Sequence, residues 1–281
     1  MIVIKKAVIA AAGLGTRLLP ATKELPKEML PVFSREGNSL CLKPMLQLIF
    51  EQLFRNGVKE FCFVVGRGKR SVVDHFTPDW GYVDELGKKG KDELAKDLEA
   101  FYRMVEQSTV VWLNQSKPKG FGHAVLLSRP FMGTEPFFVA AGDTYINSKW
   151  DDHIRRLMES FDTADASLLL EEVDDPSIYG VAVLEGTRLK SVVEKPRVPP
   201  SNYAIMPFYA FRPNIFKALE KTSPGSGGEI QLTDAIQKLV DEGGKVSAVL
   251  LREDELTLDI GTPKTYWEAV KASYKWSGVR P

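Results

Sequence analysis

The chain has 281 residues, of which 44% are hydrophobic and 26% charged, a composition typical of a globular protein. Lysine and arginine together number 37, the same as aspartate and glutamate together. A balanced chain has no bulk attraction to nucleic acid or to an anionic membrane, and no apolar run reaches membrane-spanning length. Any anionic ligand must therefore be held by a local cluster of cations.

Apolar runs of strand length alternate along the chain with segments of helical period. This alternation predicts an α/β fold with a mixed, mostly parallel central sheet flanked by helices. The predicted strands span residues 7–12, 60–65, 109–113, 136–141, 166–171, 180–184, 189–193, 203–211 and 246–251.

Three helices are predicted from their end signals and apolar faces. The first begins at Pro44 and ends at Asn56-Gly57, and the last begins at Thr262-Pro263. The apolar face of the middle helix is Trp150, Ile154, Leu157 and Phe161, and that of the last helix is Tyr266, Trp267, Val270 and Tyr274.

Residues 77–107 depart from this alternation, because they are polar and rich in lysine before a helical stretch at Leu94, Leu98, Phe101 and Val105. The pattern indicates an inserted lid or interface, or else a solvated helical excursion on the surface. Glycines and serines in residues 222–229 favour a flexible connection over a domain linker. We therefore predict a single domain over residues 1–281, with a helical insertion at about 77–107.

The stretch from Lys5 to Pro31 has the outline of a phosphate-binding loop. An apolar run breaks at Gly13 and Gly15, and Arg17 and Lys27 follow in a loop punctuated by prolines. Small residues let backbone amides approach an anion, and nearby cations balance its charge. The dinucleotide fingerprint lacks its third glycine here, and no Walker sequence occurs. An ordinary strand-to-loop turn is the alternative interpretation.

Three later clusters also suit a ligand. Gly120 and Gly122 begin a helix after Gln115, whose amide offers both a donor and an acceptor for a base edge. Asp143 and Asp259 follow apolar strands, where a carboxylate either binds a hard cation or caps a helix. The third cluster is Glu194-Lys195, which also reads as a solvated surface ion pair.

The cysteines and histidines give no catalytic pattern. Cys41 and Cys62 form no CxxC spacing, and the predicted compartment is a reducing cytosol. Cys62 lies in an apolar run and is expected to be buried and inert. His75, His123 and His153 are assigned no catalytic role, although His123 lies within the second glycine cluster.

Taken in order, these segments resemble the bacterial and archaeal UTP–glucose-1-phosphate uridylyltransferases, also called UDP-glucose pyrophosphorylases. The resemblance covers nearly the whole chain and rests on AGLGTRLLPATKELPKEMLP, the GRGKRSVVDHF stretch, KGFGHAVL, YGV, VEKP and GEIQLTDAI. It implies a Rossmann-like nucleotidyltransferase fold and a reaction in which UTP and glucose 1-phosphate give UDP-glucose and pyrophosphate.

The resemblance also implies roles for individual residues. Arg17 and Lys27 would hold the triphosphate, and Glu28 would meet uracil together with Gln115. The remaining uridine contacts would come from Ala12, Gly13, Gly120 and Gly122, and the sugar phosphate contacts from Gly180, Glu194 and Lys195. Glu28 with Gln115 would exclude CTP, because a carboxylate accepts the N3 proton that cytosine lacks. This chemistry does not exclude dTTP.

Mg²⁺ is the implied cofactor, bound by Asp143. By analogy with wider family members Asp259 would join it, whereas a site with one aspartate would leave Asp259 as a helix cap. The sequence AAGDTY departs from relatives that have a second acidic residue soon after the aspartate. The alternatives are a thymidylyltransferase, another sugar-nucleotide pyrophosphorylase, or a non-catalytic regulatory subunit that binds sugar nucleotide. The family also implies a homo-oligomer, a dimer or a tetramer.

Overall fold

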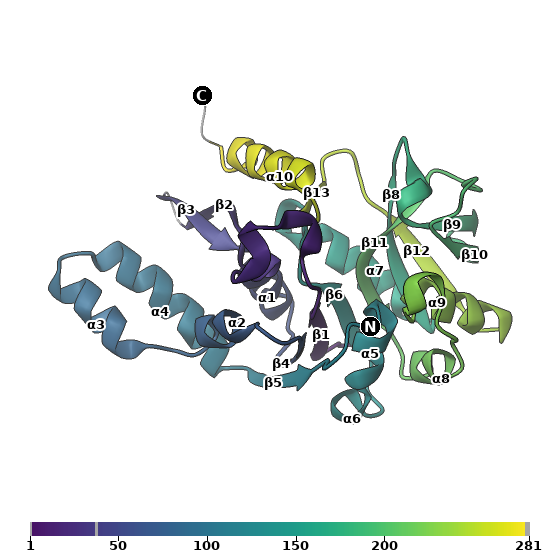
Figure 1. Cartoon of the computed structure of the whole chain (residues 1–281), viewed down its shortest axis with the longest axis horizontal. Coiled ribbons are helices and arrows are strands. Elements are labelled where there is room, and N and C mark those ends of the chain that lie inside the picture. The colour runs from purple at the N-terminus through teal and green to yellow at the C-terminus, as the bar shows by residue number, and fades with distance from the viewer. Residues whose placement is uncertain (1, 37–38, 279–281) are drawn as a thin grey trace.

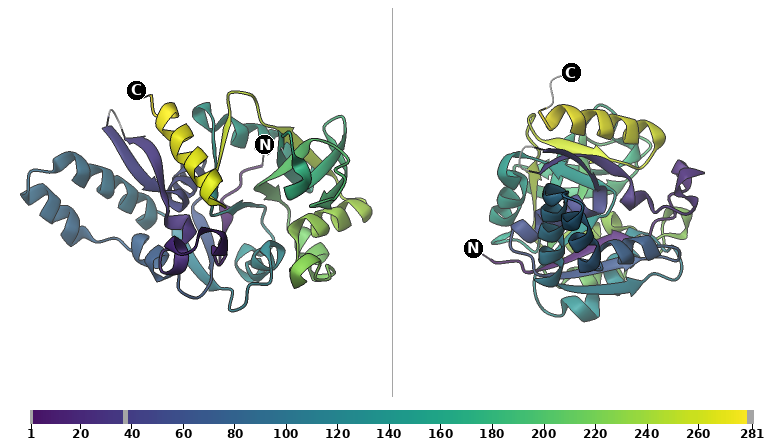
Figure 2. Two further views of the ribbon diagram at one scale, coloured as in Figure 1. Left: turned by 45° about the horizontal axis from the view of Figure 1, so that its top comes forward. Right: turned by 90° about the vertical axis from the view of Figure 1, so that its left-hand side faces the viewer.

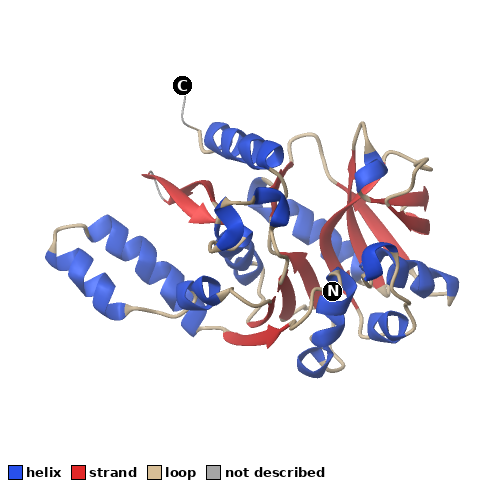
Figure 3. Ribbon diagram, in the orientation of Figure 1, coloured by secondary structure: helices blue, strands red, loops and turns tan. Residues whose placement is uncertain are grey.

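The computed structural model describes residues 2–36 and 39–278, and its centre is a nine-stranded sheet (Figures 1 and 3). All nine strands predicted from the apolar runs are confirmed in this sheet. In spatial order they are β5 (Thr109–Asn114), β4 (Glu60–Val65), β1 (Lys6–Ala11), β6 (Phe137–Ala141), β11 (Tyr203–Phe211), β8 (Ala166–Glu172), β12 (Val246–Leu250), β10 (Arg188–Glu194) and β9 (Gly180–Glu185).

The sheet is mixed, as predicted, but it is not mostly parallel, because four of the eight neighbouring pairs in the strand order are antiparallel. Strands β5, β4, β1 and β6 form a parallel block, and β12 is parallel to β8. Strand β11 is antiparallel to β6 and β8, and β10 is antiparallel to β12 and β9. Because parallel strands end at the same edge, the loops after β1, β4 and β6 lie side by side.

Two further two-stranded sheets were not predicted. One pairs β2 (Pro31–Glu36) with β3 (Ser39–Pro44), and the other pairs β7 (Thr144–Asn147) with β13 (Leu256–Asp259). These strands are interrupted by polar residues or proline, so they show no continuous apolar run. The second pair matters for the site, because it places Asp259 beside the segment that follows Asp143.

Helices cover both faces of the sheet. Buried side chains of α1, α4 and α7 join the core on one face, and those of α5, α8 and α9 join it on the other. The helices are α1 (Met45–Arg55), α2 (Arg70–His75), α3 (Trp80–Lys88), α4 (Asp92–Glu106), α5 (Phe121–Leu127), α6 (Arg129–Met132), α7 (Asp152–Phe161), α8 (Ile215–Glu220), α9 (Leu232–Asp241) and α10 (Pro263–Trp276). No helix of the described residues is long and apolar enough to cross a membrane.

Trp150 and Trp267 were each predicted to lie on the apolar face of a helix, but both are exposed. Trp150 is 89% exposed and precedes α7, in a backbone conformation with φ of 58°, so it is not part of that helix. On α10, Trp267 is 65% exposed, whereas Ala269 and Ser273 face the interior. Helix α10 packs against β2 and β13 (Figure 2). Its buried face is therefore narrower than the aromatic stripe predicted.

The predicted helical stretch in residues 77–107 is present as α3 and α4. These helices pack on each other and extend from the body of the molecule at the left of Figure 1. Phe101 and Val105 of α4 are buried, whereas Leu94 is 56% exposed. A role as lid or interface, and the status of 77–107 as an insertion in a single domain, stay predictions.

Candidate active site

The glycine loop follows β1 and is overlaid by the side chain of Lys27. A Cβ atom on Gly13 would lie 3.3 Å from Cε of Lys27, so only glycine leaves room for this side chain without displacing it. Gly15 adopts the left-handed conformation, with φ of 67°, and its carbonyl accepts a hydrogen bond of 2.7 Å from Thr22 Oγ1. The glycine loop thus leaves room at the end of β1 for the side chain of Lys27, which belongs to the 3₁₀ turn Lys27–Met29.

Lys27 and Asp143 form an ion pair at this edge of the sheet. Lys27 Nζ donates to Asp143 Oδ2, and both side chains are largely buried. Burial alone would raise the pKa of Asp143, but the charge and hydrogen bond of Lys27, a backbone hydrogen bond and the charge of Arg17 together outweigh it, and the pKa lies below its usual value. The predicted triphosphate lysine and the predicted metal ligand are therefore in direct contact.

Asp259 lies close to this pair because β13 pairs with β7. Asp259 is opposite Thr144, and the Ile260 amide donates a hydrogen bond of 3.1 Å to the Asp143 carbonyl. Burial and then the charge of Asp143 raise the pKa of Asp259, which is the behaviour of two neighbouring carboxylates. Both predicted metal residues thus meet at one place.

Arg17 faces the same place. A Cβ atom on Gly261 would lie 3.4 Å from an Arg17 guanidinium nitrogen and 3.1 Å from Asp259 Oδ2. Two cations, Arg17 and Lys27, and two carboxylates therefore gather where the strands end. The described residues contain no cluster of three metal-binding side chains. Two carboxylates suit Mg²⁺, which commonly takes one or two from the protein and completes its shell with water and phosphate oxygens.

A second buried ion pair joins Glu28 to Lys69, a residue that the sequence did not single out. The Lys69 Nζ to Glu28 Oε2 distance is 2.6 Å, and the residues are 8% and 1% exposed. Lys69 belongs to the GRGKR stretch, which carries part of the family resemblance, but no role was assigned to Lys69 itself. Its place in the loop that follows the buried strand β4 was a signal that could have identified it. The predicted contact of Glu28 with uracil stays a prediction.

The second glycine cluster is packed against the chain itself. A Cβ atom on Gly120 would lie 2.7 Å from the Ile230 carbonyl oxygen, and one on Gly122 would lie 2.8 Å from it. Gln115 is buried, and its Nε2 lies 3.2 Å from the Gly120 carbonyl oxygen and 2.9 Å from His123 Nδ1. These glycines are required for the close approach of residues 229–231, and their contact with a base stays a prediction.

The predicted sugar residues also meet. Glu194 Oε2 accepts a hydrogen bond of 2.7 Å from Thr233 Oγ1, and Glu194 Oε1 lies 2.9 Å from Lys195 Nζ. A Cβ atom on Gly180 would lie 2.9 Å from Thr233 Oγ1 and 3.3 Å from Glu194 Oε2. Lys195 is well exposed and has a φ of 42°, an unusual conformation for a lysine. Thr233 was missed, although it lies within the GEIQLTDAI segment.

The histidines and the buried cysteine behave as structural groups. Burial lowers the pKa values of His75 and His153 to about 4, and it raises that of Cys62 to about 12. His75 Nε2 lies 2.9 Å from Gln47 Oε1, and His153 Nδ1 lies 2.6 Å from Ser148 Oγ. The prediction that Cys62 is buried is confirmed, and its raised pKa supports the expectation that it is inert.

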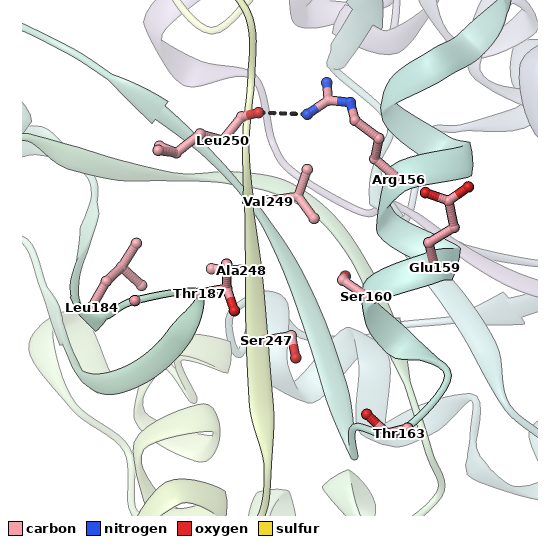
Figure 4. A pocket seen from close by; sticks show the side chains of 11 residues that line it. Arg156, Glu159, Ser160, Thr163, Leu184, Thr187, Ser247, Ala248, Val249 and Leu250 are labelled. Atoms are coloured by element: carbon pink, nitrogen blue, oxygen red, sulfur yellow. Dashed lines mark hydrogen bonds between the residues drawn. The ribbon is translucent and has the colours of Figure 1, made fainter.

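A separate cavity of about 560 Å³ lies between α7, β12 and the turn from β9 to β10 (Figure 4). Arg156 donates a hydrogen bond of 2.7 Å to the Leu250 carbonyl at its rim. None of the predicted site residues lines this cavity. The candidate active site is therefore identified from its charged side chains and not from this cavity.

Comparison with known proteins agrees with this arrangement. Residues 6–275 match the family model described as nucleotidyl transferase. The UTP–glucose-1-phosphate uridylyltransferase of Bacillus subtilis strain 168 is 40% identical over 246 residues, 84% of this chain and 80% of that relative. A solved UDP-glucose pyrophosphorylase complexed with UDP-glucose matches with a TM-score of 0.80 at 32% identity, over 97% of this chain and 99% of the other. The UTP-bound enzyme of Acinetobacter baumannii matches with a TM-score of 0.80 at 30% identity, over 96% and 93% of the two chains. The chain therefore belongs to the nucleotidyl transferase family, in the group of the UTP–glucose-1-phosphate uridylyltransferases.

Proposed function

We propose that the chain transfers the uridylyl group of UTP to glucose 1-phosphate and releases pyrophosphate. The relatives named above carry this activity in their names, and the UDP-glucose and UTP complexes carry its product and its substrate. The observation that supports the proposal most strongly is the meeting of Arg17 and Lys27 with Asp143 and Asp259 at one edge of the sheet.

The chemistry needs no general base. A sugar phosphate has a second pKa of about 6, so its attacking oxygen is already anionic at neutral pH. The reaction instead needs the reacting groups to be aligned and the charge of the departing pyrophosphate to be neutralised. This requirement agrees with a site that gathers cations and carboxylates and that uses none of the three histidines.

Asp143 and Asp259 are the residues that would hold a divalent metal, which we propose to be Mg²⁺. When bound, the ion would supply positive charge to the phosphate oxygens of the nucleotide. Arg17 and Lys27 approach the same carboxylates and would hold the triphosphate there. Two opposed carboxylates and two cations allow metal and phosphate to bind together without leaving either charge unbalanced.

On the other side of the site, Glu194 and Lys195 would bind the glucose 1-phosphate. Glu194 keeps both carboxylate oxygens in hydrogen-bonding contact, so it is oriented to accept from sugar hydroxyls. Gly180 is buried directly beside Glu194, where a side chain would crowd the Glu194 carboxylate. Lys195 presents an exposed ammonium group to an incoming phosphate.

For the base, we propose contacts from Ala12, Gly13, Gln115, Gly120 and Gly122. Gln115 already donates to the Gly120 carbonyl, so its amide orientation is fixed before a nucleotide binds. A fixed amide distinguishes uracil from cytosine by its hydrogen bonds, but thymine offers the same edge as uracil. A thymidylyltransferase is therefore the alternative with the same site.

The test is a comparison of nucleotides. UTP, dTTP, CTP and GTP are supplied in turn with glucose 1-phosphate and Mg²⁺, and kcat/KM is measured from pyrophosphate release. We expect UTP to give the highest value and CTP and GTP to give values at least about a hundredfold lower. A preference for dTTP would refute the uridylyl assignment, and the absence of turnover with every nucleotide would favour a regulatory subunit.

We also propose a cytosolic homo-oligomer, either a dimer or a tetramer. Trp267 and Trp276 are 65% and 55% exposed on α10, and large exposed apolar side chains are enriched where proteins associate. Analytical ultracentrifugation of wild type and of a Trp267→Glu, Trp276→Glu variant would test this. A wild-type chain that sediments as a monomer at micromolar concentration would contradict the proposal.

A further inference from the structure

Lys69 reaches the candidate active site from the neighbouring strand. Strand β4 is parallel to β1, with Val65 opposite Ala11, so the loop after β4 runs beside the glycine loop. The approach is close, because a Cβ atom on Gly66 would lie 3.0 Å from the Ala12 carbonyl oxygen. Lys69 then precedes α2 and directs its side chain toward the turn that carries Lys27 and Glu28.

Glu28 occupies an enclosed position between the ends of three strands. A Cβ atom on Gly142, after β6, would lie 3.2 Å from Glu28 Cγ, and one on Gly13, after β1, would lie 4.0 Å from Glu28 Oε1. Lys69, after β4, completes the enclosure. A carboxylate that is 1% exposed is costly to bury unless a partner compensates its charge, and Lys69 is placed to do so.

The position of Glu28 fixes that of Lys27, because the two residues are adjacent in one short turn. Lys27 extends over Gly13 to Asp143, so a shift of the turn would move its ammonium group away from the metal ligand. We propose that Lys69 and Glu28 are a positioning pair that holds Lys27 at the place where metal and triphosphate bind. This inference rests on the proposed function and adds Lys69 to the residues on which it depends.

The geometry favours positioning over direct reading of the base by Glu28. One carboxylate oxygen of Glu28 is bound by Lys69, and the side chain is almost completely enclosed. The two roles lead to different results. Loss of a positioning pair weakens the use of every nucleotide in the same proportion, whereas loss of a base contact changes the ratio between UTP and CTP.

The experiment compares Lys69→Met, Lys69→Arg, Glu28→Gln and the double variant Lys69→Met, Glu28→Gln. At 25 °C, with folding checked by circular dichroism, we expect Lys69→Met to lower kcat/KM for UTP at least about tenfold. The ratio of UTP to CTP should stay unchanged. Lys69→Arg should retain most activity because it keeps the ion pair, whereas the double variant should stay impaired because it lacks the pair, although no uncompensated charge remains buried in it. Arg70→Met is the matched control, since the Arg70 side chain is 92% exposed.

Three results would overturn the inference. A Lys69→Met enzyme with unchanged kcat/KM and a lower melting temperature would show that the pair only stabilises the fold. A changed ratio of UTP to CTP would instead assign Glu28 to the base. A wild-type chain without uridylyl transfer would refute the proposed function, and calorimetry with UTP would then test the pair alone. The Kd of the Lys69→Met variant for UTP should rise about tenfold, and an unchanged Kd would refute the pair.

Discussion

The two sides of the candidate active site differ in how their charges are held. On the proposed nucleotide side, Lys27 pairs with Asp143 and Lys69 with Glu28, and all four side chains are largely buried. On the proposed sugar side, the Lys195 side chain is 59% exposed and pairs with its neighbour Glu194. The nucleotide side is built where parallel strands end together, and the sugar side where β10 leaves an antiparallel part of the sheet.

The difference indicates which contacts exist before a ligand arrives. Buried pairs hold their partners in fixed positions, because separating them would leave a charge without solvent or counter-ion. An exposed lysine is free to reorient, and its pairing with a neighbouring carboxylate contributes little stability. We therefore expect substitutions on the nucleotide side to impair the chemical step, and substitutions on the sugar side to impair binding of glucose 1-phosphate.

The largest expected effect is that of Asp143→Asn. It removes a carboxylate from the proposed metal site, and metal charge contributes several kcal/mol to such reactions, so kcat should fall at least about a thousandfold. Asparagine has nearly the same shape, and circular dichroism should show a folded protein. Asp84→Asn, on the exposed face of α3, is the control. Unchanged turnover would mean that the metal site lies elsewhere.

On the sugar side, Lys195→Gln should raise the KM for glucose 1-phosphate with a smaller effect on the KM for UTP. A charge-assisted contact to phosphate contributes about 2 kcal/mol, which corresponds to about thirtyfold in kcat/KM. Lys190→Gln alters an exposed lysine of β10 and should have no effect. If both Michaelis constants rose equally, the distinction between the two sides would fail.

A lower pH should reduce the stability of the fold on which both sides of the site depend. His153 is fully buried, and burial lowers its pKa to about 4, so the unfolded chain binds a proton below about pH 6.5 that the folded chain does not. His153 therefore accounts for a loss of about 2 kcal/mol of stability between pH 7.5 and pH 5, and His75, whose pKa is lowered in the same way, adds to the loss of the wild type. Urea unfolding of wild type and His153→Gln at both pH values would measure it. An equal loss in the variant would exclude His153 as the cause.

The smallest expected effect is that of Thr233→Val, which removes the hydrogen bond of 2.7 Å to Glu194. Glu194 would keep its contact with Lys195 but lose part of its orientation. A hydrogen bond of this kind contributes about 1 kcal/mol, so the KM for glucose 1-phosphate should rise about fivefold. Thr187→Val, in the turn between β9 and β10, is the control. A larger effect on UTP would place Thr233 on the nucleotide side.

Much of the fold was predictable because its central strands are continuous apolar runs. All nine were found, and the clearest signals come from β1, β4 and β6, which are buried on both faces. The paired strands β7 and β13 carry no such run, and their pairing depends on residues more than 100 positions apart. Trp150 was assigned to a helix because periodicity does not report where a helix begins.

The site was predictable to the extent that its residues lie in recognisable loops. Structure brought Arg17, Lys27, Asp143 and Asp259 together, and likewise Gly180, Glu194 and Lys195. Lys69 and Thr233 were missed because each acts through another side chain, at a distance that only the fold determines. Spacing along a chain identifies side chains that follow strands, but not the partners that orient them.

The pairing of β7 with β13 affects when the candidate active site is completed during synthesis and folding of the chain. Asp259, the second carboxylate of the proposed metal site, lies on β13, which follows the strands of the central sheet in the chain and is synthesised after them. A chain whose last fifty or so residues had been clipped or not yet docked would keep the glycine loop and its cations but lack Asp259. Such a fragment would keep the proposed nucleotide-binding groups, but it would be an incomplete catalyst. Catalytic activity would therefore show that the C-terminal part of the chain is docked.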